Sequence, residues 1–232
     1  MWETTLRLLT GVPMLLQLVS ISVAAGAVLA VLLALARQSG IAPLDWFARG
    51  YVFVFRGSPL LVQVFLIYYG ISQFPAIRQS FLWPFLREPY WCAILAFTLN
   101  TAAYGSEIVR GGLLAVPHGQ IEAARACGMS GLLLFRRIVF PIALRQALPA
   151  YGNELILMVK ATSLASTITI MEVTGIAHRL ISETFRAVEI FICAGLIYLA
   201  INFLLTRLVA WLERRLSTER VAAAAPVAAI AH

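Results

Sequence analysis

Long apolar runs separated by short polar segments dominate the pattern of this sequence. Four of these runs contain no charged side chain, and they cover residues 8–36, 57–77, 89–106 and 190–206. A fifth run, residues 150–171, carries Lys160 at its centre. Because a helix crosses a bilayer with about 20 apolar residues, the runs predict an all-α membrane protein with five transmembrane helices. We place these helices at residues 12–36, 59–73, 90–110, 150–171 and 190–211.

Composition agrees with a membrane protein. The chain of 232 residues is 61% hydrophobic and 12% charged, which is far too apolar for an ordinary soluble domain. The net charge is +7, but the basic residues occur singly between apolar runs, so we expect no nucleic-acid partner. The cysteines Cys92, Cys127 and Cys193 show no metal-ligand spacing and are interpreted as small apolar residues. The first apolar run is longer than a signal-peptide core, so we expect it to be retained.

The arginines are divided unevenly between the two predicted sides of the membrane. Of seventeen arginines, twelve belong to the loop after the first span, the loop after the third span and the C-terminal end, and five to the opposite side. Cytoplasmic loops are enriched in basic residues. We therefore predict a periplasmic N-terminal segment at residues 1–14 and a cytoplasmic, disordered tail at residues 213–232.

Local signals mark the start of the second predicted span and the loop that follows it. Ser58 followed by Pro59 is typical of a helix start, with the serine as N-cap and the proline at the first helical position. Arg56, just before them, is interpreted as an anchor at the membrane interface. Residues 81–86 are apolar and aromatic but too short to span, so we expect them to lie at the outer surface.

A polar, arginine-bearing segment at residues 116–141 separates two apolar runs on the predicted cytoplasmic side. Residues 119–129 favour a helix, with Gly119 as its N-cap. Glu122 then lies in the first turn, where a carboxylate complements the helix dipole. An amphipathic surface hairpin that merely caps the helix bundle is the alternative interpretation.

The rest of this segment predicts a contact surface followed by a reversal. Ala123 and Ala124 leave little side chain, so another protein can approach closely. Gly128 permits a reversal before a second helix begins near residue 131. Pro141 and Pro149 are expected to break or kink that second helix before the chain enters the membrane.

The spacing in this segment resembles a family motif. Glu-Ala-Ala at 122–124, three residues, Gly128, nine residues and Ile-Val-Phe-Pro at 138–141 are similar to the EAA loop of permease subunits of bacterial ABC importers. Other stretches resemble permeases for polar amino acids, at residues 55–63, 96–100, 103–104, 107–108 and 147–154. The most similar branch handles histidine, arginine, octopine and nopaline, and residues 81–90 resemble the opine permeases in particular. The resemblance covers roughly residues 15–216.

This resemblance implies a type I importer in the bacterial inner membrane, with the permease domain at residues 15–212. A second permease subunit, identical or homologous, would complete the pore, and a periplasmic solute-binding protein would deliver the solute. ATP-binding subunits would dock on Gly119, Glu122, Ala123, Ala124 and Gly128. The chain has no G-x-x-x-x-G-K-[ST] motif. We therefore expect no enzymatic activity and no cofactor in this chain, with ATP and Mg bound by the separate ATPase.

Polar residues at membrane depth are costly and indicate function. Asn100 and Lys160 each lie at the middle of a predicted span, the depth at which alternating-access transporters bind solutes. The resemblance implies that both positions line a central cavity, and that relatives holding a cationic side chain have an acid where this chain has Lys160. A lysine attracts a carboxylate and repels a guanidinium, which favours an opine over free arginine. Ser163, one turn beyond, is a weaker candidate.

Both main candidates also have a structural interpretation. Lys160 could pair with a carboxylate of a neighbouring helix or extend towards an interface. Asn100 could form a hydrogen bond between helices.

Two glutamates lie nearer the cytoplasmic ends of the predicted spans. Glu107 and Glu154, about 10 Å nearer the cytoplasm by helical rise, are expected to pair with arginines such as Arg110 or Arg145. An ion-coupled secondary transporter would also explain these charges, but five helices without an internal repeat argue against it. A membrane-embedded enzyme is disfavoured because the sequence shows no paired carboxylates, metal cluster or nucleophile arrangement.

Overall fold

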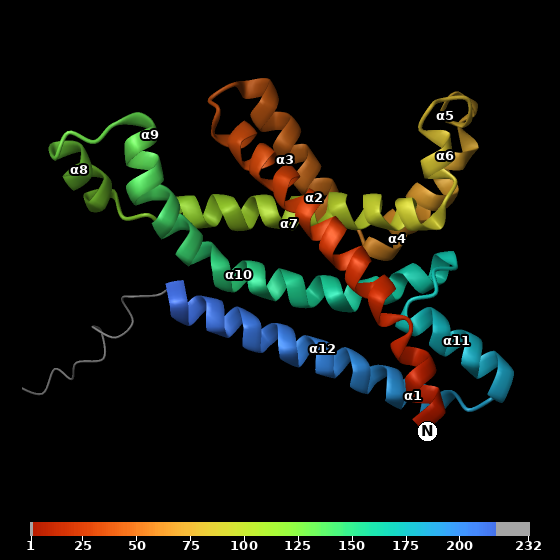
Figure 1. Ribbon diagram of the computed structural model, residues 1–232. Helices are drawn as coiled ribbons and strands as arrows, with labels where there is room; N and C mark the ends of the chain where they lie inside the picture. The colour runs from red at the N-terminus through yellow and green to blue at the C-terminus, as the bar shows by residue number, and fades with distance from the viewer. Residues whose placement is uncertain (1, 217–232) are drawn as a thin grey trace, which may run out of the picture.

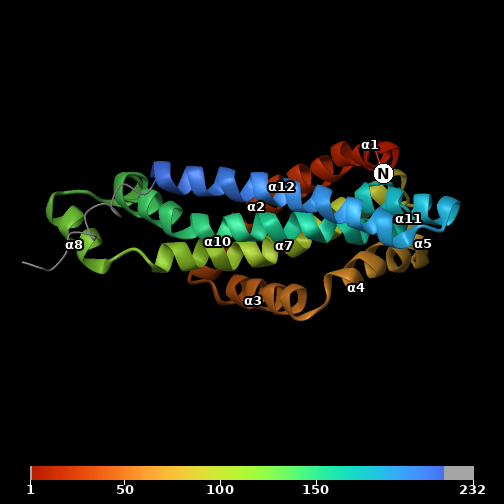
Figure 2. The same ribbon diagram turned by 90° about the horizontal axis from the view of Figure 1, so that it is seen from below.

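A computed structural model describes residues 2–216, and this part of the chain is helical with no strand. The helices α7, α10 and α12 lie side by side, and α2 and α3 cross them at an angle (Figure 1); α8 lies at one end of the molecule and α5, α6 and α11 at the other (Figures 1 and 2). In chain order the elements are α1 (Trp2–Leu9), α2 (Val12–Gln38), α3 (Ala42–Gly57), α4 (Leu60–Phe65), the π-helical η1 (Leu66–Gly70), the 3₁₀ η2 (Ile71–Gln73), α5 (Pro75–Arg78), α6 (Trp83–Leu86), α7 (Pro89–Leu114), α8 (His118–Ala126), α9 (Gly131–Leu134), the π-helical η3 (Phe135–Val139), α10 (Phe140–Ala161), the 3₁₀ η4 (Thr162–Ile168), α11 (Val173–Thr184) and α12 (Ala187–Leu216).

Three stretches of the described chain are long and apolar enough to cross a membrane alone, namely Trp2–Gln38, Pro89–Leu114 and Ala187–Leu216. Two further pairs of segments qualify only when each pair is taken together. The first pair, Ala42–Gly57 with Leu60–Gln73, is bent by 106°, and the second, Gly131–Ile168 with Val173–Thr184, by 47°. The chain therefore has three spans, or five if each bent pair is one span.

The straight spans agree with the sequence-based boundaries. The predictions at residues 12–36, 90–110 and 190–211 correspond to α2, α7 and α12. These are the segments in which a long apolar run is not interrupted by a break in the helix. The predicted tail at 213–232 starts inside α12, and beyond Leu216 it lies outside the described residues.

The segment before the second predicted span is where the prediction is wrong. Residues 42–57 were expected in a loop, but they form α3, which returns alongside α2. Ser58 is not the N-cap of the next helix, because α4 begins at Leu60 with Pro59 at the capping position. The hydroxyl of Ser58 instead donates to the carbonyl of Val54, at 2.7 Å, at the end of α3. The loop was predicted because α3 carries arginines, yet it is helical throughout.

The fourth predicted span also differs. Neither Pro141 nor Pro149 breaks the helix, since α10 has the first proline in its opening turn and continues through the second. A proline in the first turn lacks only an N–H that has no helical partner in any case. The α-helix ends instead at Ala161, and the chain continues as η4. The span predicted at 150–171 therefore starts too late and spans a change of helix type.

Small residues allow the two central helices, α2 and α7, to pack closely. A Cβ placed on Gly26 of α2 would lie 2.9 Å from the Thr101 side chain of α7, and one on Gly105 would lie 3.0 Å from the Cβ of Ala30. The spacing of four residues on both helices is the small-xxx-small pattern of membrane interfaces. This contact holds α7 in the middle of the molecule, so its polar residues face α10 and the bend after α3.

Candidate functional site

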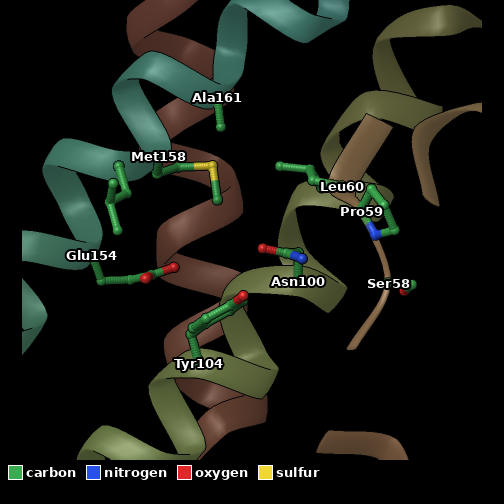
Figure 3. Close-up of a pocket in the computed structure, with 9 residues that line it drawn as sticks. Ser58, Pro59, Leu60, Asn100, Tyr104, Glu154, Met158 and Ala161 are labelled. Atoms are coloured by element: carbon green, nitrogen blue, oxygen red, sulfur yellow. The ribbon is translucent and has the colours of Figure 1, made fainter. Parts of the chain in front are cut away.

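A cavity of about 280 Å³ lies between α7, α10 and the bend that joins α3 to α4. We call it the polar cavity, and it is lined by Ser58, Pro59, Leu60, Asn100, Tyr104, Glu154, Leu157, Met158 and Ala161. Asn100 and Tyr104 are one turn apart on α7, and Glu154 and Met158 are one turn apart on α10. Figure 3 shows these two pairs projecting towards each other across the cavity.

Asn100 holds the bend in place and faces the cavity at the same time. Its side-chain amide donates to Gln63 Oε1 at 3.0 Å and to the carbonyl of Phe55 at 3.4 Å. Gln63 in turn donates to the carbonyls of Phe55 and Ser58, at 2.8 and 3.1 Å. The predicted hydrogen bond from Asn100 to a neighbouring helical segment is therefore present, and it is made by the side-chain nitrogen. Its oxygen points into the cavity (Figure 3) and has no hydrogen-bond partner among residues 2–216.

Glu154 is the acidic group of the cavity. The residue is only 6% exposed, and its carboxylate points towards Tyr104 and Asn100 (Figure 3). No hydrogen bond or ion pair joins it to another residue of the described chain, so the predicted pairing with Arg110 or Arg145 is not seen there. Because a buried carboxylate without a partner is costly, this arrangement suits a group that receives a cation from outside the chain.

Glu107, by contrast, is neutralised by two arginines. Arg110 lies one turn away on α7 and places Nη2 2.6 Å from Glu107 Oε2. Arg37 at the end of α2 makes a second ion pair with the same carboxylate. The predicted pairing of Glu107 with Arg110 is confirmed within α7, and the ion pair with Arg37 ties α2 to α7.

Arg56 lies next to the polar cavity, at the depth of the middle of α7. It was expected at the membrane interface because it directly precedes the helix start predicted at Ser58 and Pro59. As the last turn of α3 it instead follows about 20 Å of helix, beside Phe55, whose carbonyl accepts from Asn100. Its guanidinium carbon is 5.1 Å from the centre of the Tyr104 ring. Translocon-based scales put the cost of an arginine at the bilayer centre at roughly 2.5–3.5 kcal/mol, so this position indicates function.

The structure places Lys160 and Ser163 outside the lining of the polar cavity. Lys160 is the last but one residue of α10 and is exposed, and it makes no ion pair with residues 2–216. The neighbouring Ala161 lines the cavity. Ser163, in η4, donates to the carbonyl of Lys160 at 2.7 Å. Of the three predicted solute contacts, only Asn100 therefore lies in the cavity, and a role for the other two stays a prediction.

The EAA segment, residues 116–141, forms a separate projection. It contains α8, which extends past the ends of α7 and α10 (Figure 2). The helix begins at His118 after Pro117, so Gly119 lies in the first turn and is not the N-cap that was predicted. Because the helix starts earlier than predicted, Glu122 lies beyond the first turn and not within it. Glu122 and Ala123 are exposed, and Glu122 has no ion pair within the described residues.

The reversal after α8 is built as predicted. Gly128 has a φ of +81°, a left-handed conformation that glycine adopts without a Cβ penalty. The N–H of Met129 reaches back to the carbonyl of Ala124 at 3.0 Å, and that of Gly128 to Arg125 at 2.9 Å. These two bonds are those of a Schellman motif. They fold the chain so that Ile138 closes a cavity of about 330 Å³ against one side of α8, with Gln120, Ala123, Ala124, Cys127 and Met129.

Two residues of the central region were missed as candidates for a solute contact. Glu154 was expected in an ion pair, although its spacing from Met158 and Ala161, four and seven residues on, puts all three on one helix face. Arg56 was assigned to an interface because of its position beside a helix start. The length of residues 42–57 could have revealed the position of Arg56, because a run of this length can form a helix that carries Arg56 away from the interface.

Comparison with known proteins identifies the family. The family model for the binding-protein-dependent transport system inner membrane component matches residues 22–218. The octopine transport system permease protein OccM of Rhizobium meliloti is 62% identical over 227 residues, covering 98% of this chain and 93% of the relative. The nopaline transport system permease protein NocM of Agrobacterium fabrum is 55% identical over 235 residues, covering 99% and 97%.

A solved structure supports the same assignment. One chain of an amino acid ABC transporter crystallised with histidines has a TM-score of 0.83 and 34% identity, with coverage of 93% of this chain and 96% of that one. One chain of the inward-facing methionine transporter MetNI has a TM-score of 0.70 at 20% identity, which shows the shared fold. Together with the family match over most of the length, these similarities show that the chain belongs to the family of binding-protein-dependent transport system inner membrane components.

Proposed function

We propose that this chain is a permease subunit of an ATP-driven importer that moves an opine or a basic amino acid across the inner membrane. The observation that carries the proposal is the unpaired carboxylate of Glu154 facing Asn100 across the polar cavity. A solute with a guanidinium or ammonium group supplies the cation that this carboxylate lacks. The two relatives named for octopine and nopaline transport, both more than half identical to this chain, support this solute class.

The exposed surface of α8 supports a docking site for an ATPase. Glu122 and Ala123 present a charge and a small side chain to the exterior, and Gly128 fixes the end of the helix. We propose that Gly119, Glu122, Ala123, Ala124 and Gly128 contact an ATP-binding subunit. ATP and its Mg are bound there, in the partner, and the mechanical change reaches the permease through α8.

The proposed importer also contains a second permease subunit and a periplasmic solute-binding protein. The polar cavity is open on one side of this chain, and a second permease subunit, identical or homologous, closes the pore. The arginines around α8 and at the C-terminal end support a cytoplasmic position for both and a periplasmic N-terminus. A periplasmic solute-binding protein then releases its solute at the end formed by α5, α6 and α11.

The proposal is tested with Glu154→Gln in the importer reconstituted into liposomes with its ATPase, its second permease and its binding protein. Uptake of octopine and of arginine is measured with ATP on the ATPase side. We expect uptake to fall by about tenfold or more, because a charge-assisted hydrogen bond of about 1.5–3 kcal/mol is lost. Co-purification of the ATPase should be unchanged.

The matched control is Glu189→Gln, which removes an exposed carboxylate at the start of α12 that pairs only with Arg186, at 3.8 Å. It should leave uptake at the wild-type rate. Undiminished uptake in Glu154→Gln contradicts the role of the cavity. Uptake that continues without ATP and stops on addition of a proton ionophore favours an ion-coupled secondary transporter instead.

A further inference from the structure

Arg56 and Glu154 are side chains of opposite charge near Tyr104. Tyr104 and Glu154 line the polar cavity, and the guanidinium carbon of Arg56 lies over the Tyr104 ring, 5.1 Å from its centre. The guanidinium of Arg56 and the carboxylate of Glu154 form no ion pair with each other, and neither has an ion-pair partner elsewhere in residues 2–216. Each is therefore left with unused binding capacity next to the same cavity.

The surroundings of Arg56 do not use its charge. Its side chain is exposed in the single chain, and no carboxylate of residues 2–216 lies within ion-pair distance of it. The other arginine of α3, Arg49, shows the usual arrangement, with an ion pair to Asp45 at 2.8 Å one turn earlier. Since α3 ends at the depth of Asn100, a free guanidinium at this depth calls for an anion that arrives from elsewhere.

We propose that Arg56 is a specificity-determining residue that binds a carboxylate of the solute while Glu154 binds its cationic group. The planar guanidinium can donate two parallel hydrogen bonds to a carboxylate. Stacking on Tyr104 restricts the orientation of that fork, because an arginine over an aromatic face is held by a cation–π interaction. This inference rests on the proposed function, since it assigns the second end of a solute that occupies the polar cavity.

The arrangement selects for solutes that carry a cation and one or more carboxylates a few ångströms apart. Octopine has a guanidinium and two carboxylates, arginine has one carboxylate, and agmatine has the guanidinium but none. Binding by the permease should therefore weaken in that order. A solute with the cation alone leaves Arg56 without an anion.

The test measures direct binding, without the periplasmic binding protein, because that protein would impose its own selectivity. The permease–ATPase complex in nanodiscs is titrated with octopine, arginine and agmatine for the wild type, Arg56→Gln and Arg56→Lys. In Arg56→Gln we expect octopine to bind about tenfold more weakly and agmatine to bind as in the wild type. Arg56→Lys keeps the charge and should retain part of the preference for octopine. This variant also tests the proposal if Arg56→Gln does not assemble.

Arg49→Gln is the matched control, since it removes an arginine of the same helix that already has a carboxylate partner. Arg49→Gln should leave the affinities for octopine and agmatine unchanged. Equal losses for octopine and agmatine in Arg56→Gln, together with poorer recovery of the second permease, would mean that Arg56 pairs with an acid of that subunit, and the proposal is then wrong. Unchanged octopine affinity in both Arg56 variants also overturns it. A wild-type complex that binds none of the three solutes contradicts the proposed function itself.

Discussion

The EAA segment and the polar cavity are built in opposite ways. The EAA segment is continuous in sequence, and its shape comes from bonds between neighbours, such as Met129 to Ala124. The polar cavity collects three distant segments, and its central hydrogen bond joins Asn100 to Gln63, 37 residues apart. One is a projection at the end of the molecule (Figure 1), and the other is a cavity lined by side chains of α7, α10 and the bend after α3 (Figure 3).

This difference determines what a single substitution can reach. In the EAA segment a surface side chain can change without disturbing the helices that cross the membrane, so its effects should be confined to the partner that docks there. In the polar cavity a side chain such as Asn100 both supports the bend and faces the solute. Its substitution should therefore alter stability and binding together.

The largest effect is expected from Glu122→Arg in the EAA segment. It reverses the charge that α8 offers to the ATPase at an exposed position in the middle of the helix. We expect the ATPase to be lost from the purified complex and ATP-driven uptake to be abolished, while the melting temperature of the permease changes little. Size-exclusion chromatography and uptake measure the two parts of this expectation.

Two variants separate charge reversal from other causes. Glu122→Gln removes the charge alone and should weaken ATPase recovery only partly. Glu183→Arg reverses an exposed carboxylate at the opposite end of the molecule, 49% exposed, and should leave the ATPase bound. Retention of the ATPase by Glu122→Arg would show that α8 does not form the docking surface.

The same contrast explains how much could be predicted from the sequence. The reversal at Gly128 and the spans around α2, α7 and α12 follow from residues close together in the chain, and these predictions agree with the structure. The bend after α3 depends on Gln63 reaching back to Ser58 and across to Asn100. No local pattern encodes such a contact, so the sequence predicts a loop where the structure has α3.

The candidate site shows the same limit. Asn100 was found because a polar residue stands out in an apolar run. For Glu154 the sequence predicts an ion pair with an arginine. Whether such a pair forms depends on how α10 is rotated against α7, and no local pattern specifies that rotation. The sequence predicts Arg56 at the membrane interface, whereas the structure places it at the end of α3, at the depth of Asn100. The charged residues within 42–57 favour a loop, so α3 is not predicted.

A smaller effect is expected from uncoupling the bend, through Asn100→Ala, Gln63→Ala and the double variant. Each single change removes a buried hydrogen bond and should lower stability by about 1–3 kcal/mol. Because both residues serve one network, the double variant should lose less than the sum, with a coupling energy of about 0.5–3 kcal/mol. Thermal unfolding of the complex and titration with octopine report stability and binding in parallel.

The control for this cycle pairs Asn100→Ala with Ser182→Ala, whose exposed hydroxyl bonds only within α11, to Arg179 at 2.7 Å. These two effects should add. If the losses for Asn100 and Gln63 also add, the two residues act separately and the polar cavity is not held by a shared network.

The smallest effect is expected from Gly128→Ala, which tests whether the EAA segment depends only on its own backbone. The φ of +81° is unfavourable for alanine by on the order of 1 kcal/mol, so the end of α8 should open more often. Hydrogen exchange at the amides of Met129 and Gly128 should become several-fold faster, while exchange in α7 and α10 stays as in the wild type. Gly119→Ala is the matched control, because Gly119 lies within α8 with open space around its Cα, and alanine there should slow exchange slightly. Faster exchange in α10 after Gly128→Ala would show that the reversal is coupled to the membrane helices, and the contrast between a local segment and an assembled cavity would then no longer hold.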